Sequence, residues 1–178
     1  MKNILHLSDP NVYARYVHAP ELHPLVAVIH YDEVSPVRTS LNRYGVYGLF
    51  IQRNFPKNLT YGMKMFEAAD GSIIAVEPGQ IGGKEDDGED LYLSGWALLF
   101  SPQLLHGTDL EARIKDYHFF SYFATETLKM KPAEWGRLTQ LLTQMRHELK
   151  ENADSPALRA VILGYLRLIL EYCNRIYL

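Results

Sequence analysis

The chain has 178 residues, with 18 Lys and Arg side chains against 21 Asp and Glu, for a formal net charge of −3. This length suits one compact domain, or one domain with an appendage. A hydrophobic content of 47% excludes an intrinsically disordered chain. The charge balance lacks the basic surplus typical of a protein that binds duplex DNA. A single cysteine, Cys173, excludes an internal disulfide framework and a cysteine-only zinc site.

The apolar runs of the sequence do not have the length of a membrane span or of a signal-peptide core. No segment approaches the ~18 consecutive apolar residues that a membrane span requires. The apolar run within residues 1–10 is too short for the core of a signal peptide. We therefore expect a cytoplasmic protein with no membrane partner.

Up to about residue 100 the hydrophobic pattern is short and strand-like. Apolar and β-branched runs are separated by turn residues such as Asp70-Gly71, both of which tolerate a positive φ. Several short strands between turn signals are typical of a sandwich or small barrel. Strands and helices do not alternate, which argues against a doubly wound parallel sheet. The predicted strands cover residues 25–31, 44–53, 59–68, 73–76 and 91–100.

After Phe100 the hydrophobic period becomes helical. Ser101-Pro102 opens the segment, and Thr108 or Asp109 is suited to cap a short helix that ends near residue 117. Two longer amphipathic helices follow, joined by about four residues, which predicts an antiparallel hairpin. Their apolar stripes are Trp135, Leu138, Leu142, Met145 and Leu149 in the first helix, and Leu158, Ile162, Tyr165, Ile169, Tyr172 and Ile176 in the second.

The second of these helices is apolar nearly all round, because its other face carries Val161, Leu163, Leu166, Leu168 and Leu170. Such a helix is expected to be buried on two sides. One side suits the first helix or the barrel, and the other suits a second copy of the chain in a symmetric homodimer. The helix also has no stop signal, which suggests a fragment of a longer protein. The predicted dimer interface is Leu158, Ile162, Tyr165, Ile169 and Tyr172.

Residue patterns that would indicate catalysis or metal binding are missing. The seven histidines stand at positions 6, 18, 23, 30, 106, 118 and 147, and no two of them are two residues apart. The paired ligands that one strand face offers a cupin metal are therefore not present. There is no nucleophile elbow, P-loop or dinucleotide fingerprint, and Cys173 lies within a helix as a structural thiol. We expect no metal, no cofactor, no catalytic residues and no enzymatic activity.

Aromatic residues are dense in the first half and suit the wall of an apolar ligand pocket, although ordinary core packing is the alternative. Strand parity places Tyr61, Met63 and Met65 on one face, the best candidate for a pocket wall. Arg38 lies just before a strand, where it is suited to reach a ligand carboxylate or hydroxyl; a solvent-exposed loop charge is the alternative. The acidic segment 84–90 lacks the spacing of a calcium loop and is expected to be a solvated hairpin loop. The candidate effector contacts are Arg38, Tyr47, Tyr61, Met63, Met65 and Trp96.

Several segments together resemble the N-terminal regulatory half of AraC/XylS-family transcription regulators, particularly the Bacteroidetes-type members. The resemblance implies a cupin-like barrel that senses a small effector, then helices that dimerise. It also implies a C-terminal pair of helix-turn-helix motifs beyond Leu178, so that DNA binding belongs to a domain that this chain lacks. The segments that carry the resemblance are Pro78-Gly79-Gln80-Ile81, residues 95–100, residues 104–108, residues 114–122 and the terminal residues 172–178.

The expected fold is therefore α+β: a cupin-like, jelly-roll type β-barrel at residues 1–105, followed by a helical linker and dimerisation hairpin at 106–178. The expected function is to sense a small molecule of unknown identity, and to dimerise, on behalf of attached DNA-binding domains. Two alternatives stay open. One is a metal-free or atypical cupin enzyme, and the other is an interaction scaffold with no ligand.

Overall fold

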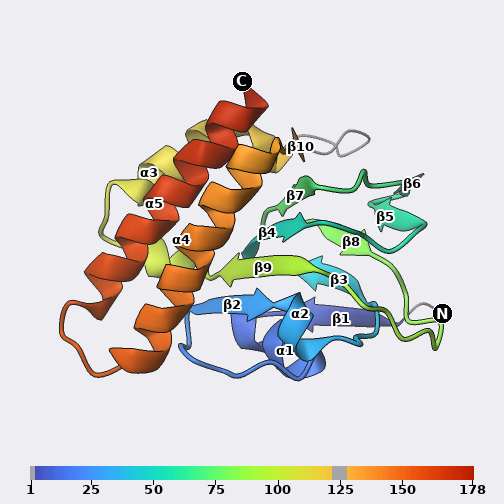
Figure 1. Cartoon of the computed structure of the whole chain (residues 1–178), viewed down its shortest axis with the longest axis horizontal. Helices are drawn as coiled ribbons and strands as arrows, with labels where there is room; N and C mark the ends of the chain where they lie inside the picture. The colour runs from blue at the N-terminus through green and yellow to red at the C-terminus, as the bar shows by residue number, and fades with distance from the viewer. Residues whose placement is uncertain (1–2, 122–127) are drawn as a thin grey trace.

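The computed structural model describes residues 3–121 and 128–178, and its strands form two facing five-stranded sheets. Sheet A has the order β1 (Ile4–Leu7), β3 (Leu41–Tyr44), β8 (Ile81–Gly83), β5 (Leu59–Tyr61) and β6 (Lys64–Phe66). Sheet B has the order β10 (Leu128–Lys129), β7 (Ser72–Val76), β4 (Tyr47–Gln52), β9 (Gly95–Phe100) and β2 (Val26–His30). Figure 1 shows the two sheets beside a layer of helices.

Sheet A pairs mostly antiparallel strands, with β1 and β3 parallel at one edge. Its central strand β8 ends in Gly82-Gly83, where the neighbouring backbones come very close. A Cβ on Gly83 would lie 2.2 Å from the carbonyl oxygen of Ser40, and Gly83 has a φ of +116°. Only glycine satisfies both conditions, so this residue allows β8 to lie between β3 and β5.

Sheet B is antiparallel throughout, and its strands β2, β4, β7 and β9 are almost entirely buried on both faces. Successive side chains of a strand point to opposite faces. On β4, Leu49 and Ile51 belong to the core under the helices, whereas Phe50 belongs to the core between the sheets. The same alternation holds for β2, β7 and β9. Because neither face meets water, these strands are nearly continuous apolar runs.

Two short helices close the sandwich near the N-terminus. Helix α1 (Pro10–Tyr16) begins after Asp9, whose carboxylate accepts a hydrogen bond from the Asn11 backbone amide at 2.8 Å. It packs Tyr13 and Ala14 into the core between the sheets, together with Val17, which follows the helix. Helix α2 (Tyr31–Val34) follows β2 directly.

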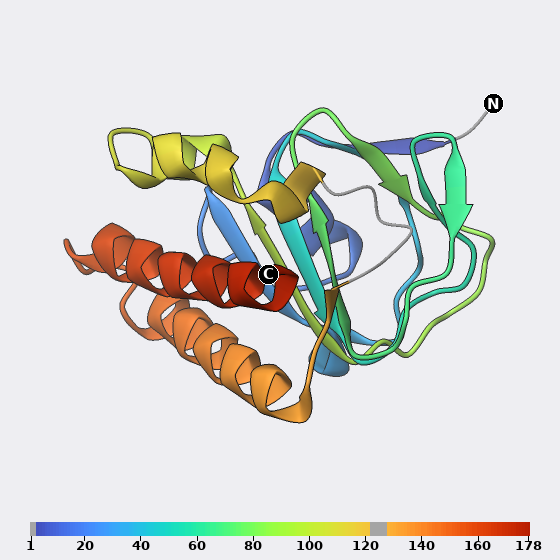
Figure 2. The same ribbon diagram turned by 90° about the horizontal axis from the view of Figure 1, so that it is seen from above.

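The helical layer covers the outer face of sheet B. It contains η1 (Pro102–Leu105), α3 (Leu110–Arg113), η2 (Ile114–Asp116) and η3 (His118–Ser121), then the two 20-residue helices α4 (Pro132–Glu151) and α5 (Leu158–Tyr177). Helix α5 returns alongside α4, and both lie on one side of the sandwich (Figures 1 and 2). No helix within 3–121 or 128–178 is long and apolar enough to cross a membrane.

The α+β class is confirmed, while a closed barrel is wrong, because the described strands form two separate sheets. The expected strand at 59–68 is two strands that turn at Gly62-Met63, and the expected strand at 91–100 begins only at Gly95. Helix α4 does begin at Pro132, as expected. Helix α1 was missed, because its seven residues are too short to show a helical period.

Three of the predicted dimer residues are buried within the chain itself. Leu158, Ile162 and Ile169 belong to the core that α4, α5 and sheet B share, so they present almost no surface to a second chain. The stripe has the pattern of an interface because most of the apolar surface of α5 packs against α4 and sheet B of the same chain. Tyr165 and Tyr172 are partly exposed. The apolar side chains that α5 exposes instead are Val161 and Leu168.

Candidate functional site: a cavity between the sheets

A cavity of about 80 Å³ opens between the two sheets. Its lining is mostly apolar with a few polar groups, which is typical of small-molecule sites. Strands β3, β5 and β8 of sheet A form one wall, and β4 and β7 of sheet B form the other. Its lining residues are Tyr13, Tyr31, Arg38, Thr39, Ser40, Asn42, Tyr44, Phe50, Gln52, Phe55, Pro56, Leu59, Thr60, Tyr61, Phe66, Ile74, Val76, Gly82, Gly83, Lys84 and Leu93.

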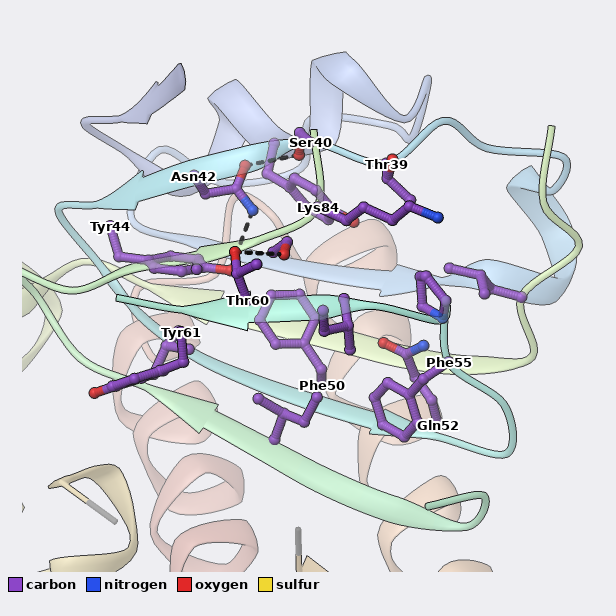
Figure 3. Close-up of a pocket in the computed structure, with 18 of the residues that line it drawn as sticks. Thr39, Ser40, Asn42, Tyr44, Phe50, Gln52, Phe55, Thr60, Tyr61 and Lys84 are labelled. Carbon is purple, nitrogen blue, oxygen red and sulfur yellow. Dashed lines mark hydrogen bonds between the residues drawn. The ribbon is translucent and has the colours of Figure 1, made fainter. Parts of the chain in front are cut away.

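Polar groups on the sheet A wall form a short hydrogen-bonded row (Figure 3). The Ser40 hydroxyl donates to Asn42 Oδ1 at 2.7 Å, and Asn42 Nδ2 donates to the Tyr44 hydroxyl at 3.1 Å. The Thr60 hydroxyl donates to the carbonyl of Gly83 at 3.1 Å. These bonds fix the amide and hydroxyl groups in place, so that a ligand meets a preorganised polar surface.

The sheet B wall is apolar apart from Gln52. This residue is only 2% exposed, and its Nε2 donates to the carbonyl of Asn54 at 2.9 Å. Figure 3 places Gln52 beside Phe55, on the far side of Phe50 from the Asn42 row. A ligand in the cavity would thus lie among aromatic rings with amide groups on both sides.

A pair of buried tyrosines lies at one end of the cavity. The hydroxyls of Tyr13 on α1 and Tyr31 on α2 are 2.6 Å apart. Burial raises the pKa of Tyr13 to about 12 and raises the pKa of Tyr31 well above its ordinary value. Both side chains are therefore neutral and are bound to each other at neutral pH.

Two cations line the cavity, and each is paired with the acidic segment that follows β8. Lys84 Nζ lies 3.2 Å from Asp87 Oδ2. Arg38 Nε donates to Asp90 Oδ1 at 2.6 Å, and its Nη1 lies 3.5 Å from Asp86 Oδ1. The hydrogen bond from the Glu89 backbone amide, followed by that from Lys84, lowers the pKa of Asp87.

The structure places two of the six predicted effector contacts, Arg38 and Tyr61, in the cavity wall. The expectation that Met63 and Met65 share a pocket face with Tyr61 is wrong. Gly62, with a φ of +59°, turns the chain there, and both methionines are exposed to solvent.

Tyr47 and Trp96 lie on the opposite face of sheet B from the cavity. The Tyr47 ring stacks on Phe100 with 5.2 Å between centroids, and the Trp96 ring stacks on His30 at 4.3 Å. Both side chains pack with the helical layer, so neither of them lines this cavity. Their aromatic character indicated burial but did not identify the face.

Sequence reasoning missed the polar residues that give the cavity its character: Asn42, Gln52 and Lys84. A signal was present for Gln52, a polar residue at the end of an otherwise apolar strand, whereas Asn42 stands between Leu41 and Arg43 with no such contrast. Lys84 was grouped with the solvated acidic segment. Its side chain is only 20% exposed and lines the mouth of the cavity instead.

Metal binding has no support in the described part of the chain, where no group of three or more His, Cys, Asp and Glu side chains is placed to hold an ion. Comparison with known proteins assigns no family: no protein-family model matches the chain, and no curated protein gives a significant match. The likeness to AraC/XylS regulators therefore stays a resemblance of sequence motifs.

Proposed function

We propose that the chain senses a small molecule and dimerises, as the regulatory part of an AraC/XylS-type transcription regulator. The observation that carries this proposal is the cavity between the sheets, whose sheet B wall is also the surface on which the helices pack. In the proposed arrangement the two sheets are a cupin-like jelly roll and α4 with α5 is the dimerisation hairpin. Contact with DNA is assigned to a separate C-terminal domain.

Sheet B offers a short physical route from ligand to helices. Phe50, Gln52, Ile74 and Val76 line the cavity, while their neighbours Leu49, Ile51, Ile73 and Ala75 pack under the helical layer. A ligand that shifts these strands changes both cores, since close-packed interiors transmit small displacements. The effect requires that the ligand bind one arrangement of the helices better than another.

The helical layer is tied together by polar contacts that hold α5 in a defined position. Glu171 on α5 accepts hydrogen bonds from the Tyr117 hydroxyl at 2.6 Å and from Arg113 Nη2 at 2.7 Å. Arg159 Nη2 donates to the carbonyl of His106 at 2.7 Å. Helix α5 therefore moves together with the segment that follows β9, and not as a loose appendage.

The exposed side of α5 is the proposed dimer surface. Val161 and Leu168 are 37% and 43% exposed, and Gly164 between them leaves room for a close neighbour. The partly exposed ring of Tyr165 borders the same stripe. A symmetric pair of such helices would remove this apolar stripe from water.

Calorimetric and thermal-shift screens of purified chain against sugars, aromatic acids and their amides test the sensing function. A ligand present at about 100 times its Kd should add about 2.7 kcal/mol to the free energy of unfolding. Thr60→Trp, which fills the cavity, should abolish that gain, and Thr143→Trp on the exposed side of α4 should preserve it.

Two results would contradict the sensing function. A folded chain that binds none of these compounds would favour the scaffold alternative. Stoichiometric transition metal in the purified protein would favour an atypical cupin enzyme instead.

A further inference from the structure

The charged side chains that line the cavity have one sign. Among the described residues that line it, Arg38 and Lys84 are charged, both are cationic, and none is acidic. The acids that neutralise them, Asp86, Asp87 and Asp90, belong to the segment outside the cavity. An anion in the cavity would therefore meet two cations and no fixed negative charge in the wall.

The pairing between these cations and acids is easily broken. The Asp87 and Asp90 side chains are 45% and 61% exposed, so water screens each pair and solvates each carboxylate that is released. Lys84 is the more buried cation, at 20% exposed against 44% for Arg38, and its ion-pair partner among the described residues is Asp87. It is the better placed of the two to bind a ligand instead of Asp87.

The remainder of the cavity is suited to an apolar body. Phe50, Phe55 and Phe66, with Leu59 and Leu93, offer rings and methyl groups. We propose, on the basis of the sensing function above, that the ligand is a small apolar carboxylic acid whose carboxylate replaces Asp87 on Lys84. Its aromatic or short aliphatic body lies among the phenylalanines, and Arg38 stands nearby as a second cation.

This exchange links the ligand to the segment that carries Asp86, Asp87 and Asp90. A ligand carboxylate on Lys84 releases Asp87 to water, and one that also engages Arg38 competes with Asp90. The native aspartates thus act as internal competitors of the ligand. Removal of one competitor is expected to tighten the binding of acids and leave neutral compounds unaffected.

Matched acids and amides provide the test, because each pair differs in charge while the body stays the same. The probes are phenylacetate with phenylacetamide, and hexanoate with hexanamide, titrated into the chain by calorimetry and by ligand-observed NMR. At least one acid should bind tenfold or more tightly than its amide. Lys84→Met should abolish that preference, Asp87→Asn should tighten the acid severalfold, and Lys150→Met on α4 should change neither affinity.

The outcomes separate this inference from the sensing function. Equal affinity for acid and amide, or no effect of Asp87→Asn on acid binding, would overturn the inference even if Lys84→Met proves unfolded. A neutral compound such as a sugar that binds in the cavity, while the acids do not, would overturn the inference and leave the sensing function standing. A folded chain that binds no acid, amide or sugar would overturn both.

Discussion

Arg146 on α4 and Glu33 on α2 form a two-pronged ion pair in which Arg146 Nη2 donates to Glu33 Oε1 at 2.7 Å. The same guanidinium lies 5.4 Å from the centroid of the Trp96 ring on β9. One side chain of the helical layer therefore contacts both helix α2, which follows the edge strand β2, and the inner strand β9 of sheet B. The pair joins the helical layer to the sandwich near the C-terminal end of α4.

This pair should make the stability depend on pH in acid. The hydrogen bond from Arg146 is the main cause that lowers the pKa of Glu33 to about 2, from an ordinary value of 4.5. The stabilisation is fully present above pH 4.5 and is lost as the pH falls towards 2. Because Glu33 is half exposed, Glu33→Gln should cost at most about 1 kcal/mol at pH 7.

Urea unfolding of wild type and Glu33→Gln at pH 7, 4 and 2.5 measures this cost. The difference between the two proteins should shrink as the pH falls. Glu151→Gln at the end of α4 serves as the control and should match wild type throughout. A difference of equal size at pH 7 and 2.5 would show that the ion pair is not its source.

The buried hydroxyls of Tyr13 and Tyr31 should be energetically coupled. Removal of one hydroxyl by Tyr13→Phe leaves the other without its partner and should cost about 1–2 kcal/mol. The double variant with Tyr31→Phe should cost less than the sum of the two single variants. Chemical denaturation of the four proteins checks this, with Tyr92→Phe as an exposed control, and simple additivity would contradict the coupling.

Gly83 should tolerate a side chain far less well than another glycine with a positive φ. Gly107 has a φ of +79° with open space around its Cβ position, so Gly107→Ala should cost only the backbone strain of about 1–2 kcal/mol. Gly83→Ala adds a clash with the Ser40 carbonyl and should lower the thermal midpoint by clearly more. Equal midpoints for the two variants would mean that β8 relaxes freely.

The exposed and buried sides of α5 should respond differently to charge. Leu168→Glu should convert a dimer to a monomer in sedimentation at tens of micromolar while the thermal midpoint of the monomer is kept. Ile169→Asp places a charge in the core and should unfold the chain instead. Thr143→Glu on α4 is the control, and a wild-type chain that sediments as a monomer would refute the dimer surface.

Cys173 should be inert in the folded chain. It is fully buried, and burial raises its pKa to about 12, so almost no thiolate is present at pH 8. A thiol-reactive chromogenic disulfide should label it only as fast as the chain opens, and promptly in 6 M guanidinium. Ser155→Cys adds an exposed thiol that should react at once, whereas equally rapid labelling of native wild type would contradict the burial.

The sequence pattern predicted where strands and helices lie better than it predicted which way their side chains face. On sheet B both faces are apolar, so alternation shows two faces without identifying which one meets the cavity. For that reason the sequence did not show that Tyr47 and Trp96 face the helices. It also did not show that much of the apolar stripe of α5 is buried within its own chain. Lys84 shows the reverse difficulty, since a charged residue in an acidic loop segment gives no sign of lining a cavity.

The two walls of the cavity differ in what lies behind them. The helices pack on the outer face of sheet B, whereas sheet A exposes residues such as Arg43 and Lys64 to solvent. A substitution at Thr60 or Asn42 can reshape the cavity without disturbing α4 and α5, but one at Phe50 or Ile74 alters both. The cavity can thus be reshaped from sheet A while the contact between sheet B and the helices stays as it is.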